Sequence, residues 1–304
     1  MQFIKSSAEV LKITDPIDLI ETCGRVCYKT KPSENTKKGD LFKRLVNSGH
    51  HSVFEHVNFI FRIECDNVMG IPYVPDIPKI FNTTKESGFM YASSNLRFIK
   101  ESGDQRFIDM ILEKYPELQP YLGNSSADNY RTRLITLVTR REFINSAPSR
   151  ESIAAHLYTT MLFETDRGVA NEIVRHRKCA FSQESSRYCN YSKDKFGREI
   201  RFIVPSDTEG VVSDENFNAY YKCLRCIEDT YMFLLNHGCN TEFARGVLPL
   251  ELATTLAVTT NHEEWEYIFG LRYFEITGKV HPNMKVLMRR AREAYYEDHW
   301  KPYS

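Results

Sequence analysis

The most informative stretch of this 304-residue chain is residues 175–188, Arg-His-Arg-Lys-Cys-Ala-Phe-Ser-Gln-Glu-Ser-Ser-Arg-Tyr. Its basic beginning offers more hydrogen-bond donors than a protein core could satisfy. Arginine forks also match the geometry of phosphate and carboxylate groups. We interpret the tripeptide 175–177 as an anion-binding group on a helix. A solvated basic helix end is the alternative interpretation.

The polar run that follows the tripeptide has the composition of an exposed strand. If Ser182–Tyr188 is extended, the two-residue repeat of a strand places Gln183, Ser185 and Arg187 on one face. The residues between them would lie on the other face. The first face is predicted to be a polar row that binds a ligand.

Composition limits the class of protein. Lys and Arg together number 40, as do Asp and Glu, so the net charge is zero. This balance argues against a protein that binds nucleic acid nonspecifically, because such binding depends on excess positive charge. No run of eighteen apolar residues and no secretory signal is present, so we expect a soluble, cytoplasmic protein without a membrane segment.

The eight cysteines are scattered without a paired framework, which suits reduced thiols. Cys223 and Cys226 form a Cys-x-x-Cys pair, with His237 and Cys239 beyond it, so a zinc site is one alternative. We favour no metal, because structural zinc normally joins two closely spaced ligand pairs. On a helix these cysteines are expected to be small buried hydrophobic residues.

The pattern of elements predicts a single α+β domain over residues 1–304, with a mixed or antiparallel sheet and a predominantly helical C-terminal half. Helices are expected at 16–28, 41–47, 107–115, 130–142, 214–236, 241–258 with a kink at Pro249, 263–273 and 282–297, and strands at 59–65, 89–99 and 157–164. Expected helix caps are Asp15, Asp40, Ser213 and a capping box of Ser52 with Glu55. Residues 66–150 are interpreted as an insertion or expanded hairpin.

Arg272 stands out by its position on a predicted helix. Trp265, Ile268, Phe269 and Arg272 share one face, so the guanidinium continues an apolar stripe. A buried guanidinium requires an acceptor. The alternative is a side chain that reaches past the helix end into solvent.

Two further blocks accompany the 175–188 stretch in a fixed order. Upstream lies Ser48–His56, Ser-Gly-His-His-Ser-Val-Phe-Glu-His, and downstream lie Ala244–Pro249, Asn261 and Leu271-Arg272. Together the blocks resemble the signature of the flavin-dependent thymidylate synthases over roughly two-thirds of the chain. The resemblance implies the fold of that family, a homotetramer, and sites assembled from several chains.

The resemblance also implies a reaction: methylation of dUMP to dTMP, with methylenetetrahydrofolate as carbon donor and NADPH as reductant through FAD. Arg272 would be the catalytic residue, binding the uracil and stabilising its anionic form. The implied dUMP-binding residues are Glu172, Arg175, Gln183, Glu184, Ser185, Ser186, Arg187, Arg245 and Arg272. The implied cofactor-binding residues are His50, Ser52, Arg175, His176, Arg177, Gln183, Asn261, Glu263 and Tyr267, and no metal is required.

For some of these positions the residues themselves suggest a different role or raise an objection to the implied one. Glu172, Glu263 and Tyr267 stand where the family often has Gln, Arg and Asn, and an acid beside a pyrophosphate is unfavourable, so Glu263 is expected to face elsewhere. Arg245 could instead pair with Glu242 one helical turn earlier. Ser185 is expected to hydrogen-bond dUMP and not to act as a nucleophile, because no Ser-His-Asp order is readable around it.

The helical interpretation of the tripeptide leads to a further expectation. On a helix, Arg175 and Arg177 point about 200° apart and cannot grip one phosphate together. We therefore expect Arg175 between flavin and dUMP, and Arg177 at the FAD phosphate, with the FAD shared across a subunit interface.

Two other classes of function remain open at this point. One is a catalytically inactive relative that binds dUMP or flavin. The other is an RNA-binding or RNA-modifying protein, against which the zero net charge and the lack of interleaved aromatic residues argue.

Overall fold

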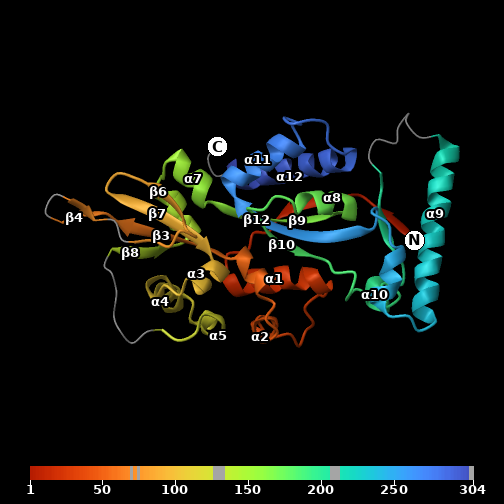
Figure 1. Ribbon diagram of the computed structural model, residues 1–304, viewed down its shortest axis with the longest axis horizontal. Helices are drawn as coiled ribbons and strands as arrows, with labels where there is room; N and C mark the ends of the chain where they lie inside the picture. Colours follow the sequence, from red (N-terminus) through yellow and green to blue (C-terminus); the bar gives the residue numbers. More distant parts are fainter. Residues whose placement is uncertain (69–70, 74–75, 126–133, 206–212, 301–304) are drawn as a thin grey trace.

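The computed structural model describes residues 1–68, 71–73, 76–125, 134–205 and 213–300 (Figure 1). Its strands are β1 (Gln2–Ile4), β2 (Ser7–Val10), β3 (Asn58–Glu64), β4 (Asp66–Val68), β5 (Ile71–Tyr73), β6 (Asn82–Lys85), β7 (Phe89–Asn95), β8 (Ile135–Val138), β9 (Tyr158–Asp166), β10 (Ala180–Gln183), β11 (Arg201–Ile203) and β12 (Ala253–Asn261).

Helices account for most of the remaining described residues. The α-helices are α1 (Pro16–Tyr28), α2 (Asp40–Asn47), α3 (Leu96–Ser102), α4 (Gln105–Lys114), α5 (Gln119–Leu122), α6 (Arg140–Asn145), α7 (Arg150–His156), α8 (Arg167–Ile173), α9 (Asp214–Asn236), α10 (Thr241–Ala244), α11 (His262–Arg272) and α12 (Pro282–Trp300). Short 3-10 turns are η1 (His51–His56), η2 (Pro116–Leu118), η3 (Asp194–Phe196) and η4 (Arg245–Val247).

Two four-stranded antiparallel sheets organise these elements. The central sheet has the order β10-β12-β9-β2, and the outer sheet has the order β6-β7-β3-β8. β1 and β11 form a separate parallel pair. The α+β class, with antiparallel sheets, is therefore confirmed.

The central sheet is covered on both faces (Figure 1). Leu256 and Val258 of β12 pack with Trp265 in a core that α8, α11 and α12 complete. Ala257, between them, belongs to the core that includes Ile17 and Ile20 of α1. The alternation follows from the two-residue repeat of a strand, and it assigns α8, α11 and α12 to one face and α1 to the other.

Several predicted elements are confirmed. α1 begins at Pro16, and the side chain of Asp15 accepts a hydrogen bond from the Asp18 amide at 3.0 Å. α9 begins after Ser213, whose hydroxyl accepts from the Asn216 amide at 3.2 Å. Gly49 follows the end of α2 with a φ of +70°, the left-handed conformation that favours glycine at this position.

The predicted helix at 241–258 is wrong beyond its first turns. α10 and η4 end at Val247, and after Pro249 the chain forms β12. β12 pairs with β9 along its whole length and with β10 on its other side. Threonines at 254, 255, 259 and 260 favour a strand over a helix, because β-branched side chains pack well on a pleated surface.

The predictions between residues 89 and 142 are partly wrong. The strand expected at 89–99 ends at Asn95, whose side chain caps α3 by accepting from the Phe98 amide at 2.9 Å. Part of the helix expected at 130–142 lies outside the described residues. The rest is β8, followed by α6, which begins with a capping box of Thr139 and Glu142.

Two predicted caps are also wrong. Asp40 is the first residue of α2, and Gly39 occupies the cap position. Ser52 and Glu55 form no capping box, because η1 is a 3-10 turn without a side-chain cap and Glu55 accepts from Arg97 Nη1 at 2.6 Å. Cys223 and Cys226 are exposed on α9, contrary to the expectation that they are buried.

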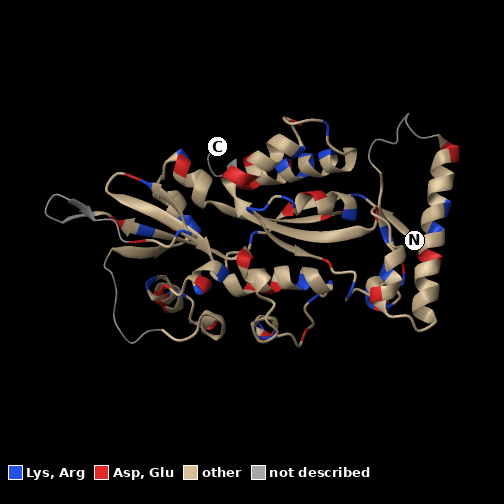
Figure 2. Ribbon diagram, in the orientation of Figure 1, with Lys and Arg blue, Asp and Glu red and all other residues tan. Residues whose placement is uncertain are grey.

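No helix in the described part of the chain is long and apolar enough to cross a membrane. Within the same residues, no group of three or more metal-ligating side chains is present. Lys and Arg are interspersed with Asp and Glu over the ribbon (Figure 2), in keeping with the balanced composition.

A buried histidine attaches the outer sheet to α7. His156 Nδ1 lies 2.7 Å from Ser93 Oγ of β7, and its Nε2 lies 2.9 Å from Thr84 Oγ1 of β6. Burial lowers the pKa of His156 from 6.5 to about 4, so the ring is neutral at neutral pH. Both hydroxyls are suited to a neutral ring, because each can donate or accept.

Acidification should therefore destabilise the fold. Between about pH 6.5 and pH 4 the unfolded chain binds a proton at residue 156 that the folded chain does not, so stability falls as pH falls. The expected loss from this histidine is about 2 kcal/mol at pH 5. Urea unfolding of wild type and His156→Gln at pH 7 and pH 5 measures it.

The variant should lose stability at pH 7 but show a smaller drop between the two pH values. His281→Gln, at an exposed position, is the matched control and should keep the wild-type pH dependence. An equal drop in wild type and His156→Gln would contradict the assignment.

Candidate active site

Asn261 positions α11. Its Oδ1 accepts from the Glu264 amide at 3.0 Å, which caps the helix, and its Nδ2 donates to the Ala155 carbonyl at 3.1 Å. Trp265, Ile268 and Phe269 are fully buried and fix the helix against the central sheet. The apolar face predicted from the sequence is confirmed, and it leads to Arg272 at the last residue of the helix.

The side chain of Arg272 contacts two residues near the C-terminal end of α8, one in its last turn and one just beyond it. Its Nη1 lies 3.0 Å from Glu172 Oε2, and its Nε donates to His176 Nε2 at 3.3 Å. Three residues named separately in the sequence therefore meet. We call Arg272, Glu172 and His176 the Arg272 cluster. The side chains of Arg272 and Glu172 remain 23% and 41% exposed, so a ligand can reach them.

His176 is neutral in this cluster. Burial, and secondly the charge of Arg272, lower its pKa to about 4. Because Arg272 donates to Nε2, the ring proton lies on Nδ1, which is 3.7 Å from Glu264 Oε1. That approach is not an ion pair, since the ring carries no charge. Burial in turn raises the pKa of Glu264.

The tripeptide at 175–177 does not lie on a helix, so that expectation is wrong. α8 ends at Ile173, and the chain continues in turns closed by the His176 amide on the Ile173 carbonyl at 3.1 Å. His176 is buried while Arg175 and Arg177 are exposed. Among the described residues neither arginine has a side-chain partner, so both guanidinium groups are available for an anion.

The polar run after β10 is also not extended as expected. β10 ends at Gln183, and the Tyr188 and Cys189 amides bond to the Ser185 carbonyl at 3.1 and 3.0 Å, which closes a turn. The Ser185 amide donates to the Cys27 carbonyl of α1 at 3.0 Å. The predicted strand is therefore replaced by a turn held against the end of α1.

An alternation of burial survives within this turn. Gln183 and Ser185 are half-buried and Arg187 is exposed, whereas Glu184 and Ser186 are buried. The three residues of the predicted polar row are thus more accessible than Glu184 and Ser186, with Gln183 at the end of β10 and Ser185 and Arg187 in the turn, although Tyr188, predicted on the other face, is exposed as well.

Glu184 is engaged inside the protein. Its carboxylate lies 3.0 Å from Lys29 Nζ and accepts from the Tyr191 hydroxyl at 2.7 Å. Its side chain is fully buried, whereas that of Lys29 is 24% exposed. Burial, and then the Glu184 charge, raise the pKa of Tyr191, so this hydroxyl remains a donor. The Lys29–Glu184 ion pair therefore holds the turn at residues 184–188 in place from its buried side.

Arg187 and Arg245 both lie beside α10, Arg187 through an ion pair and Arg245 as the next residue of the chain. Arg187 Nη2 pairs with Glu242 Oε1 of α10 at 2.6 Å, and both side chains are exposed. Arg245 begins η4, is exposed, and does not pair with Glu242, contrary to the alternative considered from the sequence. Within the described residues Arg245 has no side-chain partner.

Three rings gather at the C-terminal end of α1. Tyr28 OH lies 3.4 Å from His50 Nδ1, and the Tyr28 ring centroid is 5.4 Å from that of Tyr188. We call Tyr28, His50 and Tyr188 the Tyr28 cluster. Burial lowers the pKa of His50, with a smaller effect from His51. Ser52, two residues after His50, is exposed.

The Arg272 cluster and the Tyr28 cluster belong to different faces of the central sheet. α8 and α11 cover the face of Leu256, and α1 covers the face of Ala257. In the register of β10, Gln183 pairs with Leu256 and Ser182 pairs with Ala257, so Gln183 is directed to the side of α8 and α11. Within one chain the two clusters are not brought together.

Other predicted residues are placed as follows. Glu263 and Tyr267 are exposed on α11, and the Tyr267 ring lies 6.4 Å from that of His176. Both polar groups of Asn261 are used by the fold. Sequence reasoning missed Tyr28, Lys29 and Tyr191, since they contact the site from distant parts of the chain and carry no local motif.

Comparison with known proteins gives the class of this protein. The model of the family described as "Thymidylate synthase complementing protein" matches residues 9–70 and 121–295. The chain belongs to this family. Residues between the two matched ranges include β6, β7, α3 and α4.

Individual relatives carry a more specific name. The chain is 31% identical over 126 residues to a flavin-dependent thymidylate synthase of Geobacter sulfurreducens, covering 41% of this chain and 52% of the relative. It is 32% identical over 127 residues to one of Pyrococcus furiosus, covering 41% and 50%. The chain thus spans about half the length of these relatives. Among solved structures, a UMP/dUMP methylase of Streptomyces cacaoi bound with 5-Br dUMP is 16% identical, with a TM-score of 0.41 over 98% of this chain and 93% of that one.

Substitution of Lys29 tests whether its ion pair with Glu184 stabilises the turn at residues 184–188. Lys29→Met leaves the buried Glu184 carboxylate without its cation, so the free energy of unfolding should fall by about 3 kcal/mol. Lys285→Met is the matched control: it breaks the partly exposed pair with Glu275 at 2.6 Å and should cost less than about 1 kcal/mol. Urea unfolding measures both. Equal losses in the two variants would contradict the role of Lys29.

Proposed function

We propose that this protein is a flavin-dependent thymidylate synthase that methylates dUMP to dTMP. Methylenetetrahydrofolate supplies the carbon, and NADPH supplies the electrons through FAD. Membership of the family and the names of the relatives support the reaction class. The observation that carries the proposal is the Arg272 cluster, in which a partly exposed guanidinium is held in place by Glu172 and His176.

Arg272 is the catalytic residue of this proposal. A guanidinium near uracil stabilises negative charge on the base, and such preorganised charges act most strongly where water is excluded. Glu172 and His176 orient the fork of Arg272 before substrate arrives. Because His176 is neutral, the cluster contains no second positive charge that would repel Arg272.

The polar turn and its neighbouring arginines are proposed to bind dUMP. Gln183 at the end of β10 and Ser185 and Arg187 in the turn are accessible, and Arg175 and Arg245 are exposed cations suited to phosphate. Glu184 and Ser186 are buried, so we assign them to shaping the turn and not to holding the nucleotide directly.

The residues present fit a flavin cofactor. Arg177 at the pyrophosphate, and Arg175 between flavin and dUMP, offer guanidinium groups that have no side-chain partner among the described residues, and Ser52 and His50 offer an exposed hydroxyl and a half-buried ring. Glu263 and Tyr267 are exposed, and an acid beside a pyrophosphate is unfavourable, so Glu263 is placed away from it. A bound flavin supplies the redox chemistry of the reaction, while the protein binds and orients the reactants.

The site is proposed to be shared between chains of a homotetramer. The Arg272 cluster and the Tyr28 cluster belong to opposite faces of the central sheet, and both kinds of residue are needed for dUMP and flavin. A second copy that brings its Arg272 face to the Tyr28 face of the first would complete the site. The residues at 66–150 are proposed to be an insertion or expanded hairpin within one domain, since the family match omits residues 71–120.

The direct test is spectroscopic and catalytic. The purified protein should show the absorption bands of oxidised flavin. It should also form dTMP from dUMP when methylenetetrahydrofolate and NADPH are supplied. Flavin and dUMP binding without dTMP formation would favour an inactive relative, and absence of both would refute the proposal.

Arg272→Ala should abolish most dTMP formation while flavin stays bound. Loss of one such electrostatic interaction costs about 3 kcal/mol in the transition state, or roughly a hundredfold in kcat. Arg272→Lys should rescue poorly, because a point charge cannot replace a planar fork. Steady-state turnover measures the effect, with Arg289→Ala, at an exposed position on α12, as the control. Near wild-type turnover in Arg272→Ala would show that Arg272 is not the catalytic residue.

Arg177→Ala should lower flavin occupancy without unfolding the protein, because the side chain is exposed and has no side-chain partner in the part of the chain that the structure describes. If the FAD is shared across an interface, flavin loss should be accompanied by dissociation of the oligomer. Absorbance and sedimentation measure the two effects. Full flavin content with an unchanged oligomer would overturn the role of Arg177.

A further inference from the structure

A short 3-10 turn carries two of the residues proposed to contact the flavin. η1 contains Ser52 and follows His50 directly. It has no side-chain cap, and the Val57 amide reaches the Phe54 carbonyl only at 3.4 Å. Hydrogen bonds in a 3-10 turn have poorer geometry than those in an α-helix. Contacts from other elements therefore hold η1 in its conformation.

One set of these contacts comes from parts of the chain that the family model matches. His56 lies within hydrogen-bond distance of Thr259 in β12 and Ser182 in β10. The Phe54 ring meets the Phe42 ring of α2 at nearly a right angle, with centroids 5.8 Å apart. All five residues belong to the matched ranges.

A second set of contacts comes from α3. Arg97 Nη1 lies 2.6 Å from Glu55 Oε1, and the two side chains are 34% and 23% exposed. The Leu96 amide donates to the carbonyl of Val57, the residue that follows η1, at 2.8 Å. α3 lies entirely between the two ranges that the family model matches. An element outside the family match therefore contacts η1 in this chain.

α5 adds an aromatic contact to the same turn. The Tyr121 ring stacks on the Phe54 ring with centroids 4.0 Å apart, and it meets the His51 ring at 5.2 Å. Lys100 Nζ of α3 lies 4.0 Å from the centroid of the Tyr121 ring. α3, α5 and η1 are thus packed together, with the Arg97–Glu55 pair as their contact between opposite charges.

We propose that Arg97 is a positioning residue for the flavin. It holds Glu55, and through Glu55 it holds η1 in the conformation that presents His50 and Ser52. This role gives the segment between the matched ranges a function in cofactor binding. The inference rests on the proposed function, because it concerns affinity for the flavin of that reaction.

The affinity should depend on this pair for a general reason. When only a fraction of the molecules has a competent binding turn, the apparent affinity falls by that fraction. Hydrogen bonds between charged groups contribute more than those between neutral ones. Loss of the Arg97–Glu55 pair should therefore lower the competent fraction, while the groups proposed to touch the flavin stay in the protein.

The experiment measures release of FAD from the full-length holoprotein. Arg97→Met removes the cation and keeps a long side chain, so the dissociation constant for FAD should rise about tenfold. Fluorescence of the flavin freed on dilution measures it. Turnover at saturating FAD should stay within about twofold of wild type, because added FAD refills the site. Arg97→Lys should recover most of the affinity, since a single nitrogen, Nη1, contacts Glu55.

A double variant tests whether Arg97 acts through Glu55. Glu55→Gln alone should weaken FAD binding about as much as Arg97→Met does, and it keeps the test valid if Arg97→Met does not fold. Addition of Arg97→Met to Glu55→Gln should then change the dissociation constant less than about twofold, because the interaction is already lost. A further weakening of about tenfold would show that Arg97 acts without Glu55 and would overturn the proposal.

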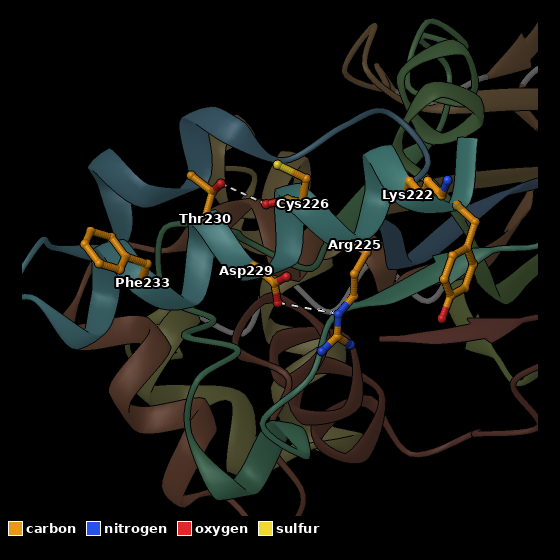
Figure 3. Close-up of a pocket in the computed structure, with 7 residues that line it drawn as sticks. Lys222, Arg225, Cys226, Asp229, Thr230 and Phe233 are labelled. Atoms are coloured by element: carbon orange, nitrogen blue, oxygen red, sulfur yellow. Dashed lines mark hydrogen bonds and ion pairs between the residues drawn. The ribbon is translucent and has the colours of Figure 1, made fainter. Parts of the chain in front are cut away.

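Two controls make the same substitution elsewhere. Arg106→Met breaks an ion pair with Asp104 at 2.6 Å, also between the matched ranges. Arg225→Met changes α9, at the end of the molecule remote from α3 (Figure 1). Like Arg97, Arg225 pairs with two acids, Glu228 at 3.2 Å and Asp229 at 3.5 Å, the second of which Figure 3 shows. Both controls should keep the wild-type affinity for FAD.

The outcomes separate this role from the reaction itself. Wild-type affinity in a folded Arg97→Met protein would overturn the role of Arg97 and leave the proposed function standing. Equal weakening in both controls would indicate a general loss of stability and would also overturn the role. Absence of flavin from the wild-type protein would refute the proposed function, and this role with it. Circular dichroism and urea unfolding confirm that each variant folds.

Discussion

The pairing of β12 with both β9 and β10 is the constraint on which the rest of the structure depends. Nine residues of β12 pair with β9, and the last of them, Asn261, also caps α11. The strand therefore fixes where α11 starts and, ten residues later, where Arg272 lies. Because successive side chains of a strand point to opposite faces, the same pairing separates the core behind α11 from the core beneath α1.

Buried polar groups transmit this constraint to the candidate site. His56 Nδ1 lies 2.7 Å from Thr259 Oγ1 of β12, and its Nε2 lies 3.0 Å from Ser182 Oγ of β10. Burial lowers the pKa of His56 to about 3, so it remains neutral. Two other buried groups hold the site in the same way. Glu184 pairs with Lys29, and His176 accepts a hydrogen bond from Arg272. Unpaired buried polar groups are costly, and these residues are therefore held in place, while the exposed arginines beside them remain available for ligands.

Local signals predicted much of the fold. The Asp15 and Ser213 caps, the start of α1 at a proline and the apolar face of α11 depend on residues close in sequence, and each is confirmed. The failures in and around the candidate site occurred where contacts from distant residues decided the conformation. The segment after Pro249 has helical neighbours, but pairing with β9 and β10 makes it a strand. The tripeptide 175–177 and the turn at 184–188 depart from their predicted forms for the same reason, since His176, Glu184 and the Ser185 amide are each fixed by a partner far along the chain.

The sequence by itself determined the class of the fold, the blocks that resemble one enzyme family, and the chemical character of the residues that those blocks contain. The tertiary structure decided which of these residues are free and which are engaged. It directs Gln183 and Glu184 to different faces, joins Arg272 to Glu172 and His176, and leaves Arg175, Arg177 and Arg245 without partners among the described residues. The physical reason is that burial and pairing depend on contacts between residues far apart in the sequence, 155 positions for Lys29 and Glu184 and 203 for His56 and Thr259, and no local pattern encodes such contacts.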